Sequence, residues 1–128
     1  MPRRAVWLPL GLAALVLVAG CGSAKTYSLA KTRACLAQQQ GVRLESGVDF
    51  VASTALGGAL TAELPHNQVT IAFGLDRDEA DRLATAYRRF RGRNIGIEDI
   101  LRPTRNAVLL WKGHPSPEDE ATIRGCLK

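Results

Sequence analysis

The feature that most constrains this chain is one apolar run near its beginning, from Val6 to Ala19, which Arg3 and Arg4 precede. The run covers about 14 residues, fewer than the ~20 that a helix needs to cross the hydrocarbon core of a bilayer. Positive charge, a short apolar stretch and small residues after it are, in that order, the parts of a secretory signal peptide. The sequence therefore predicts export and removal of residues 1–20. The alternative is a permanent membrane-anchoring helix.

A cysteine directly follows the small residues, in the order Val18-Ala19-Gly20-Cys21. This tetrapeptide resembles the lipobox of bacterial lipoproteins, with Val18 where leucine is commoner. The resemblance implies transfer of a diacylglyceryl group to the Cys21 thiol, cleavage after Gly20 and acylation of the new amino group. It implies a chain held by its lipid on the extracytoplasmic face of the cell membrane. Ordinary secretion with Cys21 left free is the alternative, and the export route, general secretory or twin-arginine, stays open.

The chain after the cleavage site has the size of one globular domain. Residues 21–25 form a tether that reaches about 15 Å when extended, so the domain over 26–128 is expected to lie against the membrane surface. The sequence is 46% hydrophobic and 23% charged, as ordinary globular chains are. Its net charge of +5 falls to +3 when Arg3 and Arg4 are removed. Neither this mild charge nor export favours a nucleic acid as partner.

Two cysteines remain when Cys21 carries lipid. They are Cys35 and Cys126, near the two ends of the mature chain. Exported domains reside where disulfides persist, so the sequence predicts a Cys35–Cys126 bridge that closes a loop of about ninety residues. The alternative is a catalytic or redox thiol, but the chain has no Cys-x-x-Cys motif and no histidine close to either residue.

Hydrophobic periodicity and turn residues predict an α+β fold with the element order α-β-β-α-β-α. The predicted elements are a helix over 28–40, a hairpin of strands 59–64 and 69–73, a helix capped by Asp76, a strand over 107–111 and a last helix that begins at Ser116. Residues 42–44 add an optional short strand, 45–57 are expected to be a loop and 103–106 a turn. We expect a small sheet of three or four strands with the helices packed on one face and the terminal helices joined by the disulfide.

Two patterns identify the expected core. In the helix after Asp76, the spacing of Ala80, Leu83, Tyr87 and Phe90 predicts one buried stripe. The strand over 107–111 is apolar at every position, which is typical of a strand buried on both faces. This pattern favours a core position for Trp111 over a role as a platform for a ligand.

Arginine is the one unevenly distributed residue type. Arg82, Arg89 and Arg93 are seven and four residues apart and, at about 100° per residue, line one flank of the same helix. One interpretation is a solvated helix face in an arginine-rich proteome. The other is a contact surface for anionic lipid headgroups or a cell-wall polymer, which the short tether would bring within reach.

The sequence contains no recognised motif for catalysis, metal ligation or cofactor binding. His66 and His114 lie in different predicted loops. The acidic residues at 76–81 and 118–120 are explained as helix caps and first turns. No catalytic residue, metal ligand or cofactor is therefore predicted.

The lipobox, the Cys35/Cys126 pair and the bias towards Ala, Arg, Gly and Leu resemble those of small uncharacterised lipoproteins of high-GC Gram-positive bacteria. We expect a lipid-anchored, non-enzymatic domain with an interaction or envelope-associated role. Its expected partners are the membrane and an envelope protein or an anionic polymer or lipid. Two alternatives are a small-ligand binding module, with the 45–57 loop and Trp111 lining its pocket, and a hydrolase of unrecognised type.

Overall fold

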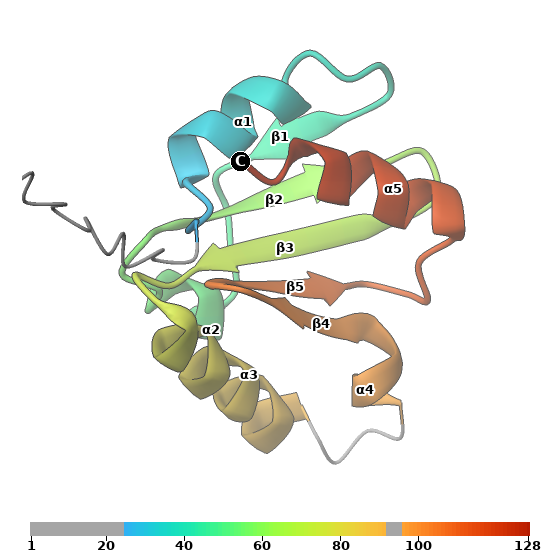
Figure 1. Ribbon diagram of the computed structural model, residues 1–128. Coiled ribbons are helices and arrows are strands. Elements are labelled where there is room, and N and C mark those ends of the chain that lie inside the picture. Colours follow the sequence, from blue (N-terminus) through green and yellow to red (C-terminus); the bar gives the residue numbers. More distant parts are fainter. Residues whose placement is uncertain (1–24, 92–95) are drawn as a thin grey trace, which may run out of the picture.

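The computed structural model describes residues 25–91 and 96–128. In this part of the chain, five strands form one antiparallel sheet in the order β1-β2-β3-β5-β4 (Figure 1). The strands are β1 (Arg43–Glu45), β2 (Ala59–Glu63), β3 (Gln68–Phe73), β4 (Leu101–Thr104) and β5 (Ala107–Trp111). The helices are α1 (Leu29–Leu36), α2 (Phe50–Ser53), α3 (Arg77–Arg91), α4 (Ile97–Ile100) and α5 (Pro117–Cys126).

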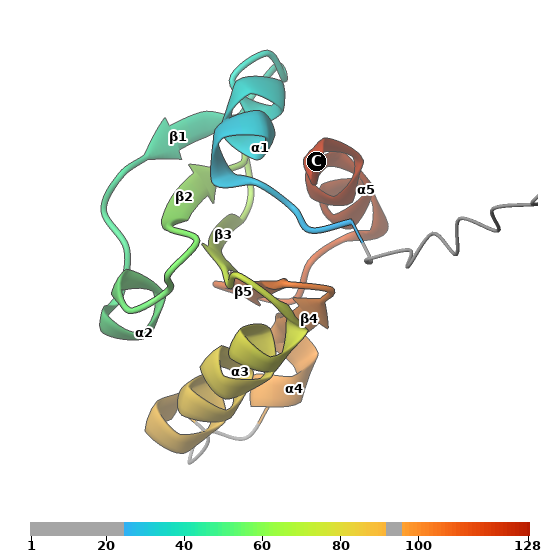
Figure 2. The same cartoon turned by 60° about the vertical axis from the view of Figure 1, so that its left-hand side comes forward.

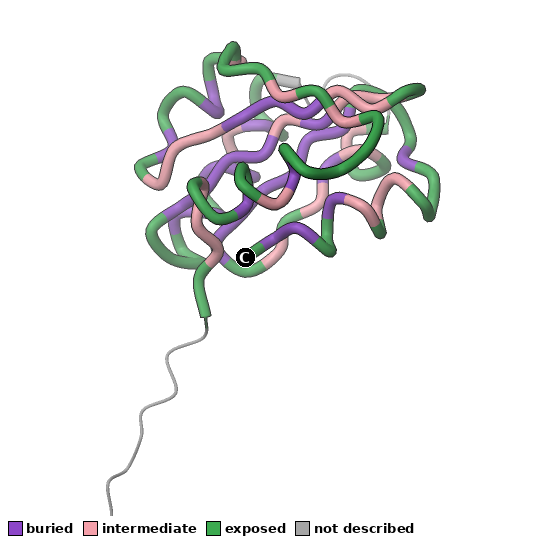
Figure 3. Tube along the Cα trace, turned by 90° about the horizontal axis from the view of Figure 1, so that it is seen from above, coloured by how far each residue is buried: buried purple, intermediate pink, exposed green. Residues whose placement is uncertain are grey.

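Helices cover both faces of the sheet (Figure 2). Side chains of β5 alternate between two cores: Leu109 and Trp111 pack with α1 and α5, whereas Val108 and Leu110 pack with α2 and α3. Buried residues follow the strands and the inner sides of the helices, and exposed residues follow the outer sides of the helices and most loops (Figure 3). The predicted α+β class is confirmed, but the expectation that helices pack on one face is wrong. A strand that is apolar at every position needs a cover on each side.

The sheet has more strands than the three or four expected. The segment around Pro103, predicted as a turn, belongs to β4, and only Arg105 and Asn106 connect it to β5. Proline is tolerated there because β4 is an edge strand, where a missing N–H leaves no ladder bond unmade. The predicted loop over 45–57 contains the short helix α2, whose first turn is capped by Asp49 through a 3.0 Å hydrogen bond from the Ala52 N–H.

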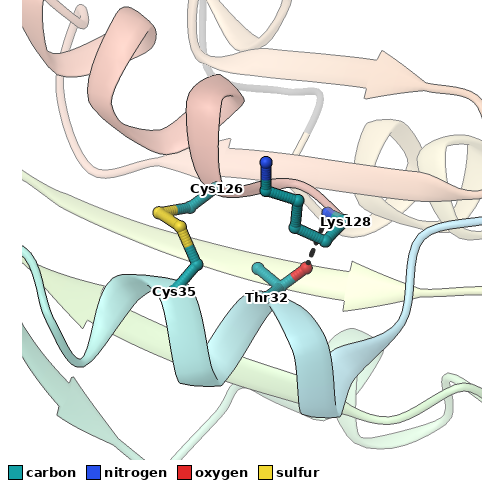
Figure 4. The surroundings of a disulfide bond; sticks show 4 residues. All are labelled: Thr32, Cys35, Cys126 and Lys128. Carbon is teal, nitrogen blue, oxygen red and sulfur yellow. Dashed lines mark hydrogen bonds between the residues drawn. A yellow bond between two sulfur atoms is a disulfide. The ribbon is translucent and has the colours of Figure 1, made fainter.

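The predicted disulfide is present and joins the terminal helices. Cys35 on α1 and Cys126 at the end of α5 are bonded, with Cα atoms 5.3 Å apart (Figure 4). The Thr32 hydroxyl accepts a 3.3 Å hydrogen bond from the Lys128 N–H beside the bridge. The main-chain oxygen of Lys128 accepts a 2.6 Å bond from the Ser28 N–H. Two chain segments about 90 positions apart are therefore held together at three points.

The buried stripe of α3 is confirmed for three of its four members. Ala80, Leu83 and Tyr87 are buried, whereas Phe90 is 67% exposed, so its predicted core position is wrong. The reason is the length of α2, which is a single turn. At Phe90 it offers only the ring of Phe50, which packs edge to face with ring centroids 6.3 Å apart. Spacing shows which residues share a face, but not how far the covering element extends.

Candidate functional site

The predicted site residues fall into three groups. Cys21 and Arg93 lie outside the described residues. Cys35 and Cys126 are joined to each other, so neither is a free thiol. Arg82 and Arg89 are exposed on α3, and within the described ranges neither forms an ion pair.

The outer face of α3 carries these two arginines because the opposite face packs on the sheet. Asp76 begins the helix by accepting a 2.8 Å hydrogen bond from the Glu79 N–H, which confirms the predicted cap. Arg82 and Arg89 are two turns apart, about 10 Å along the axis. Both guanidinium groups are therefore available to one extended anionic partner.

Exposed apolar side chains lie beside the arginines. Phe50 and Phe90 are 74% and 67% exposed, and Leu56, between α2 and β2, is 71% exposed. A hollow of about 290 Å³ between the end of α2 and α3 is lined by both Leu56 and Arg82. We call these five residues, Phe50, Leu56, Arg82, Arg89 and Phe90, the α2–α3 surface. It combines positive charge with apolar area, as surfaces that bind the membrane interface do.

Two carboxylates hold α2 against α3 beneath this surface. Glu79 is 6% exposed and accepts hydrogen bonds from the N–H groups of Leu56, at 2.9 Å, and Leu75, at 3.2 Å. Asp49 accepts from the Ala52 N–H and from the Tyr87 hydroxyl, at 2.9 Å to its nearer oxygen. Both carboxylates thus bind groups of the fold itself. Glu79 belongs to the acidic residues at 76–81 that were expected to serve helix capping, whereas no role was predicted for Asp49.

At the other end of α3, an ion pair connects it to α4. The Nε of Arg88 lies 2.5 Å from Oε1 of Glu98, and its Nη2 lies 3.3 Å from Oε2. These hydrogen bonds lower the pKa of the Glu98 carboxyl and raise the pKa of the Arg88 guanidinium. The pair is exposed, so it orients α4 more than it stabilises the domain.

A second hollow lies on the face of the sheet that α2 and α3 cover, over the part that these helices leave open. Its volume is about 530 Å³, and it brings together residues 47–49 from the predicted loop, Thr61 and Thr70 from the sheet, and Lys112. Trp111 also borders it, but the Trp111 side chain is fully buried in the core on the opposite face. The core position of Trp111 is confirmed. Its indole N–H has no hydrogen-bond partner in the described part of the chain.

The structure brings the two histidines to one place. His66, between β2 and β3, and His114, before α5, line a hollow of about 420 Å³. The His114 Nδ1 lies 2.7 Å from a carboxylate oxygen of Asp99. Among residues 25–91 and 96–128, no three His, Cys, Asp or Glu side chains are grouped so that they could hold a metal ion.

Sequence reasoning missed one cluster of cations. Lys25, Lys31, Arg105 and Lys128 surround Tyr27 at the end of the sheet where the described chain begins. Its members come from segments far apart in the sequence, so no local pattern marks them. The only sequence signal is that three of the four lysines of the chain lie in its terminal segments.

Comparisons with known proteins found no relative of this chain. No protein-family model, no curated protein and no solved structure matches the chain. Within the described residues, none of the helices has both the length and the apolar character that crossing a membrane requires.

Proposed function

We propose that this protein is a lipid-anchored extracytoplasmic domain with a non-enzymatic interaction or envelope-associated role. The observation that carries the proposal is the Cys35–Cys126 disulfide, because structural disulfides persist in oxidising compartments outside the cytoplasm. The tetrapeptide Val18-Ala19-Gly20-Cys21 supports it independently. Together they favour a domain that is exported and then held at the membrane.

The place where the described chain begins fits a close attachment. Lys25 follows Cys21 by four residues, a span of about 14 Å at full extension. The main-chain oxygen of Lys25 accepts a 3.4 Å hydrogen bond from Arg105, in the turn between β4 and β5. A lipid on Cys21 would therefore keep this end of the sheet next to the headgroups.

We propose further that the α2–α3 surface, together with Arg93, contacts an anionic membrane or cell-wall polymer. Arginines near an anionic surface contribute about 1 kcal/mol each, and the attraction fades within a Debye length. Exposed apolar rings such as Phe50 and Phe90 add to binding by entering the interface between headgroups and acyl chains. Such a surface would orient an anchored domain, and it would bind only weakly without the anchor.

The anchor is tested by the intact mass of protein taken from the membrane fraction. We expect a chain that starts at Cys21 and exceeds the peptide mass by a diacylglyceryl unit. An unmodified amino terminus elsewhere would contradict the anchor, whatever the disulfide state.

The contact surface is tested with the domain over residues 22–128, purified without lipid and checked for folding by circular dichroism. Weak binding to vesicles of rising anionic content is expected at low salt, and changing Arg82, Arg89 and Arg93 to glutamine should abolish it. The matched control changes three exposed cations elsewhere, Arg33, Lys112 and Arg124, to glutamine and should retain binding. If both variants lose vesicle binding equally, the binding is explained by non-specific charge alone. If only the control loses vesicle binding, the contact surface lies elsewhere on the domain.

A small-ligand binding module is the second candidate. The hollow of about 530 Å³ favours it, because residues 47–49 of the predicted loop and Trp111 both border that hollow. The hydroxyls of Thr61 and Thr70 also line it and suit a polar ligand. Screening of small polar solutes by NMR tests it. Saturable shifts at Thr61 and Thr70 would support the module, and their absence across the set would count against it.

A further inference from the structure

A basic hollow lies at the end of the sheet where the described chain begins. It has a volume of about 690 Å³ and is lined by Lys25, Lys31, Arg105 and Lys128 around the half-buried Tyr27. None of its lining residues is Asp or Glu. The hollow thus gathers four cationic side chains beside one aromatic ring, with no acidic side chain among them.

Long-range contacts hold the parts of this hollow in place. The Tyr27 N–H donates to the Oδ1 of Asn106 at 2.6 Å, and the Nδ2 of Asn106 donates to the Tyr27 carbonyl at 2.9 Å, although the two residues are 79 positions apart. Asn106 is 2% exposed and donates also to the carbonyl of Gly74. Lys128 is fixed by Ser28, by Thr32 and by the neighbouring disulfide. The main-chain segments that carry the cations are therefore held in place by contacts between distant parts of the chain.

Arg105 occupies a backbone position that is unfavourable for arginine. Its φ is +52°, in the two-residue turn between β4 and β5, where glycine or asparagine is the usual residue. Its guanidinium lies over the Tyr27 ring, 5.2 Å from the centroid, and Nη1 donates to the Lys25 carbonyl. Turn geometry does not explain an arginine here, whereas a role for its positioned side chain does.

We propose that this hollow binds a phosphate group. A planar guanidinium donates paired hydrogen bonds to phosphate oxygens, and lysine ammonium groups add point charges around them. The phosphate could belong to a membrane headgroup, which the short span to Cys21 would bring close, or to a soluble phosphate ester. Only the headgroup source rests on the proposed anchor. The site itself consists of described residues and stands without the anchor.

Lysine acylation tests the site directly, because the chain carries only four lysines and Lys112 lies outside the hollow. The full protein is labelled with an amine-acylating reagent, and the rate at each lysine is read by peptide mass spectrometry. One arm adds glycerol 3-phosphate, with sodium chloride at the same ionic strength as its control. The other arm compares vesicles of phosphatidylcholine with vesicles that also contain phosphatidylglycerol.

We expect several-fold slower acylation at Lys25, Lys31 and Lys128, with Lys112 unchanged. Protection by glycerol 3-phosphate identifies a soluble ester, and protection by the anionic vesicles alone identifies a headgroup. Either result supports the site. Protection in neither arm, or equal protection of Lys112, overturns it. The soluble arm needs no anchor, so a failure of the anchoring proposal leaves it informative.

The Arg105→Asn variant separates binding from folding. Asparagine adopts positive φ readily, so the variant should unfold at the same or a higher temperature than wild type and still lose the protection. Arg89→Asn removes the same charge from α3 and should keep the protection by glycerol 3-phosphate. Lys31→Gln, on the exposed side of α1, serves as a second variant and should weaken protection at Lys25 and Lys128. Full protection in both Arg105→Asn and Lys31→Gln would overturn the proposal.

Discussion

The two faces of the sheet are closed by different means. On the α1/α5 face, Leu36, Trp111 and Ile123 are fully buried, and the Cys35–Cys126 disulfide joins the covering helices. On the α2/α3 face, the carboxylates of Asp49 and Glu79 hold the helices together through hydrogen bonds. Apolar side chains pack on both faces, but the helices of one cover are also joined by a covalent bond and those of the other by polar contacts.

The two covers differ because the helices of one are far apart in the sequence and those of the other are close together. Helices α1 and α5 come from opposite ends of the described chain, so a link between them constrains nearly all of the unfolded chain. Helices α2 and α3 are close in sequence and need only a few hydrogen bonds to set their positions. The less tightly closed face is also the one that leaves Phe50 and Phe90 exposed. We therefore expect stability to depend mostly on the first face and surface contacts on the second.

Removing the disulfide should have the largest effect. Replacement of Cys35 and Cys126 by alanine is expected to lower the free energy of unfolding by roughly 4–5 kcal/mol, because the bridge closes a loop of about 90 residues. Urea denaturation measures the change, and wild type in reducing agent is the control. A loss of less than about 1 kcal/mol would show that the hydrogen bonds of Ser28 and Thr32 suffice to hold α1 and α5 together.

Removing the buried carboxylate of the other face should have a smaller effect. Glu79→Ala leaves the N–H groups of Leu56 and Leu75 without their acceptor, at a cost of about 2–3 kcal/mol in unfolding free energy. Glu79→Gln keeps an acceptor oxygen and should cost about 1 kcal/mol. Thermal unfolding of the two variants measures the difference. If they are equally destabilised, the negative charge at the start of α3 matters more than the hydrogen bonds.

Tyr87→Phe should weaken the same face by about 1–2 kcal/mol. The change keeps the buried ring and removes the hydroxyl that donates to Asp49. A double-mutant cycle with Asp49→Asn isolates this contact by urea denaturation. Additive effects of the two changes would mean that the hydrogen bond does not couple α2 to α3.

The exposed pair Arg88–Glu98 should give the smallest effect, visible as a pH dependence. The hydrogen bonds from Arg88 lower the pKa of Glu98 in the folded state. The pair therefore stabilises the fold above the unfolded-state pKa of glutamate, about 4.3, and the contribution is lost as the pH falls through the lower folded pKa. Melting temperatures of wild type and Arg88→Gln should differ slightly at neutral pH and converge in acid. A difference in melting temperature that stays constant down to the lowest pH would contradict a stabilising role of the ionised Glu98.

Most local elements were predicted because their signals lie within a few residues, although the helix expected over 28–40 ends at Leu36 and the short helix α4 was not predicted. Ser116 caps α5 by accepting from the Asp119 N–H, and the β2–β3 hairpin follows from alternating side chains. The α2 helix was missed because its capping residue, Asp49, precedes a segment too short to show a period. Strand β4 was missed because Pro103 looks like a turn residue until the neighbouring strand shows it to be at a sheet edge.

The sequence predicted the Cys35–Cys126 pairing, the position of α3 and the exposure of Arg82 and Arg89, because the number of cysteines, the capping residue and the helical periodicity can be read from the chain alone. Tertiary structure alone decided that both sheet faces are covered, that Phe90 stays exposed, and that Tyr27 meets Asn106 from 79 positions away. Such contacts depend on strand order and on the length of covering helices, which no short stretch encodes. The basic hollow around Tyr27 belongs to this second kind, since only the folded chain brings its cations together.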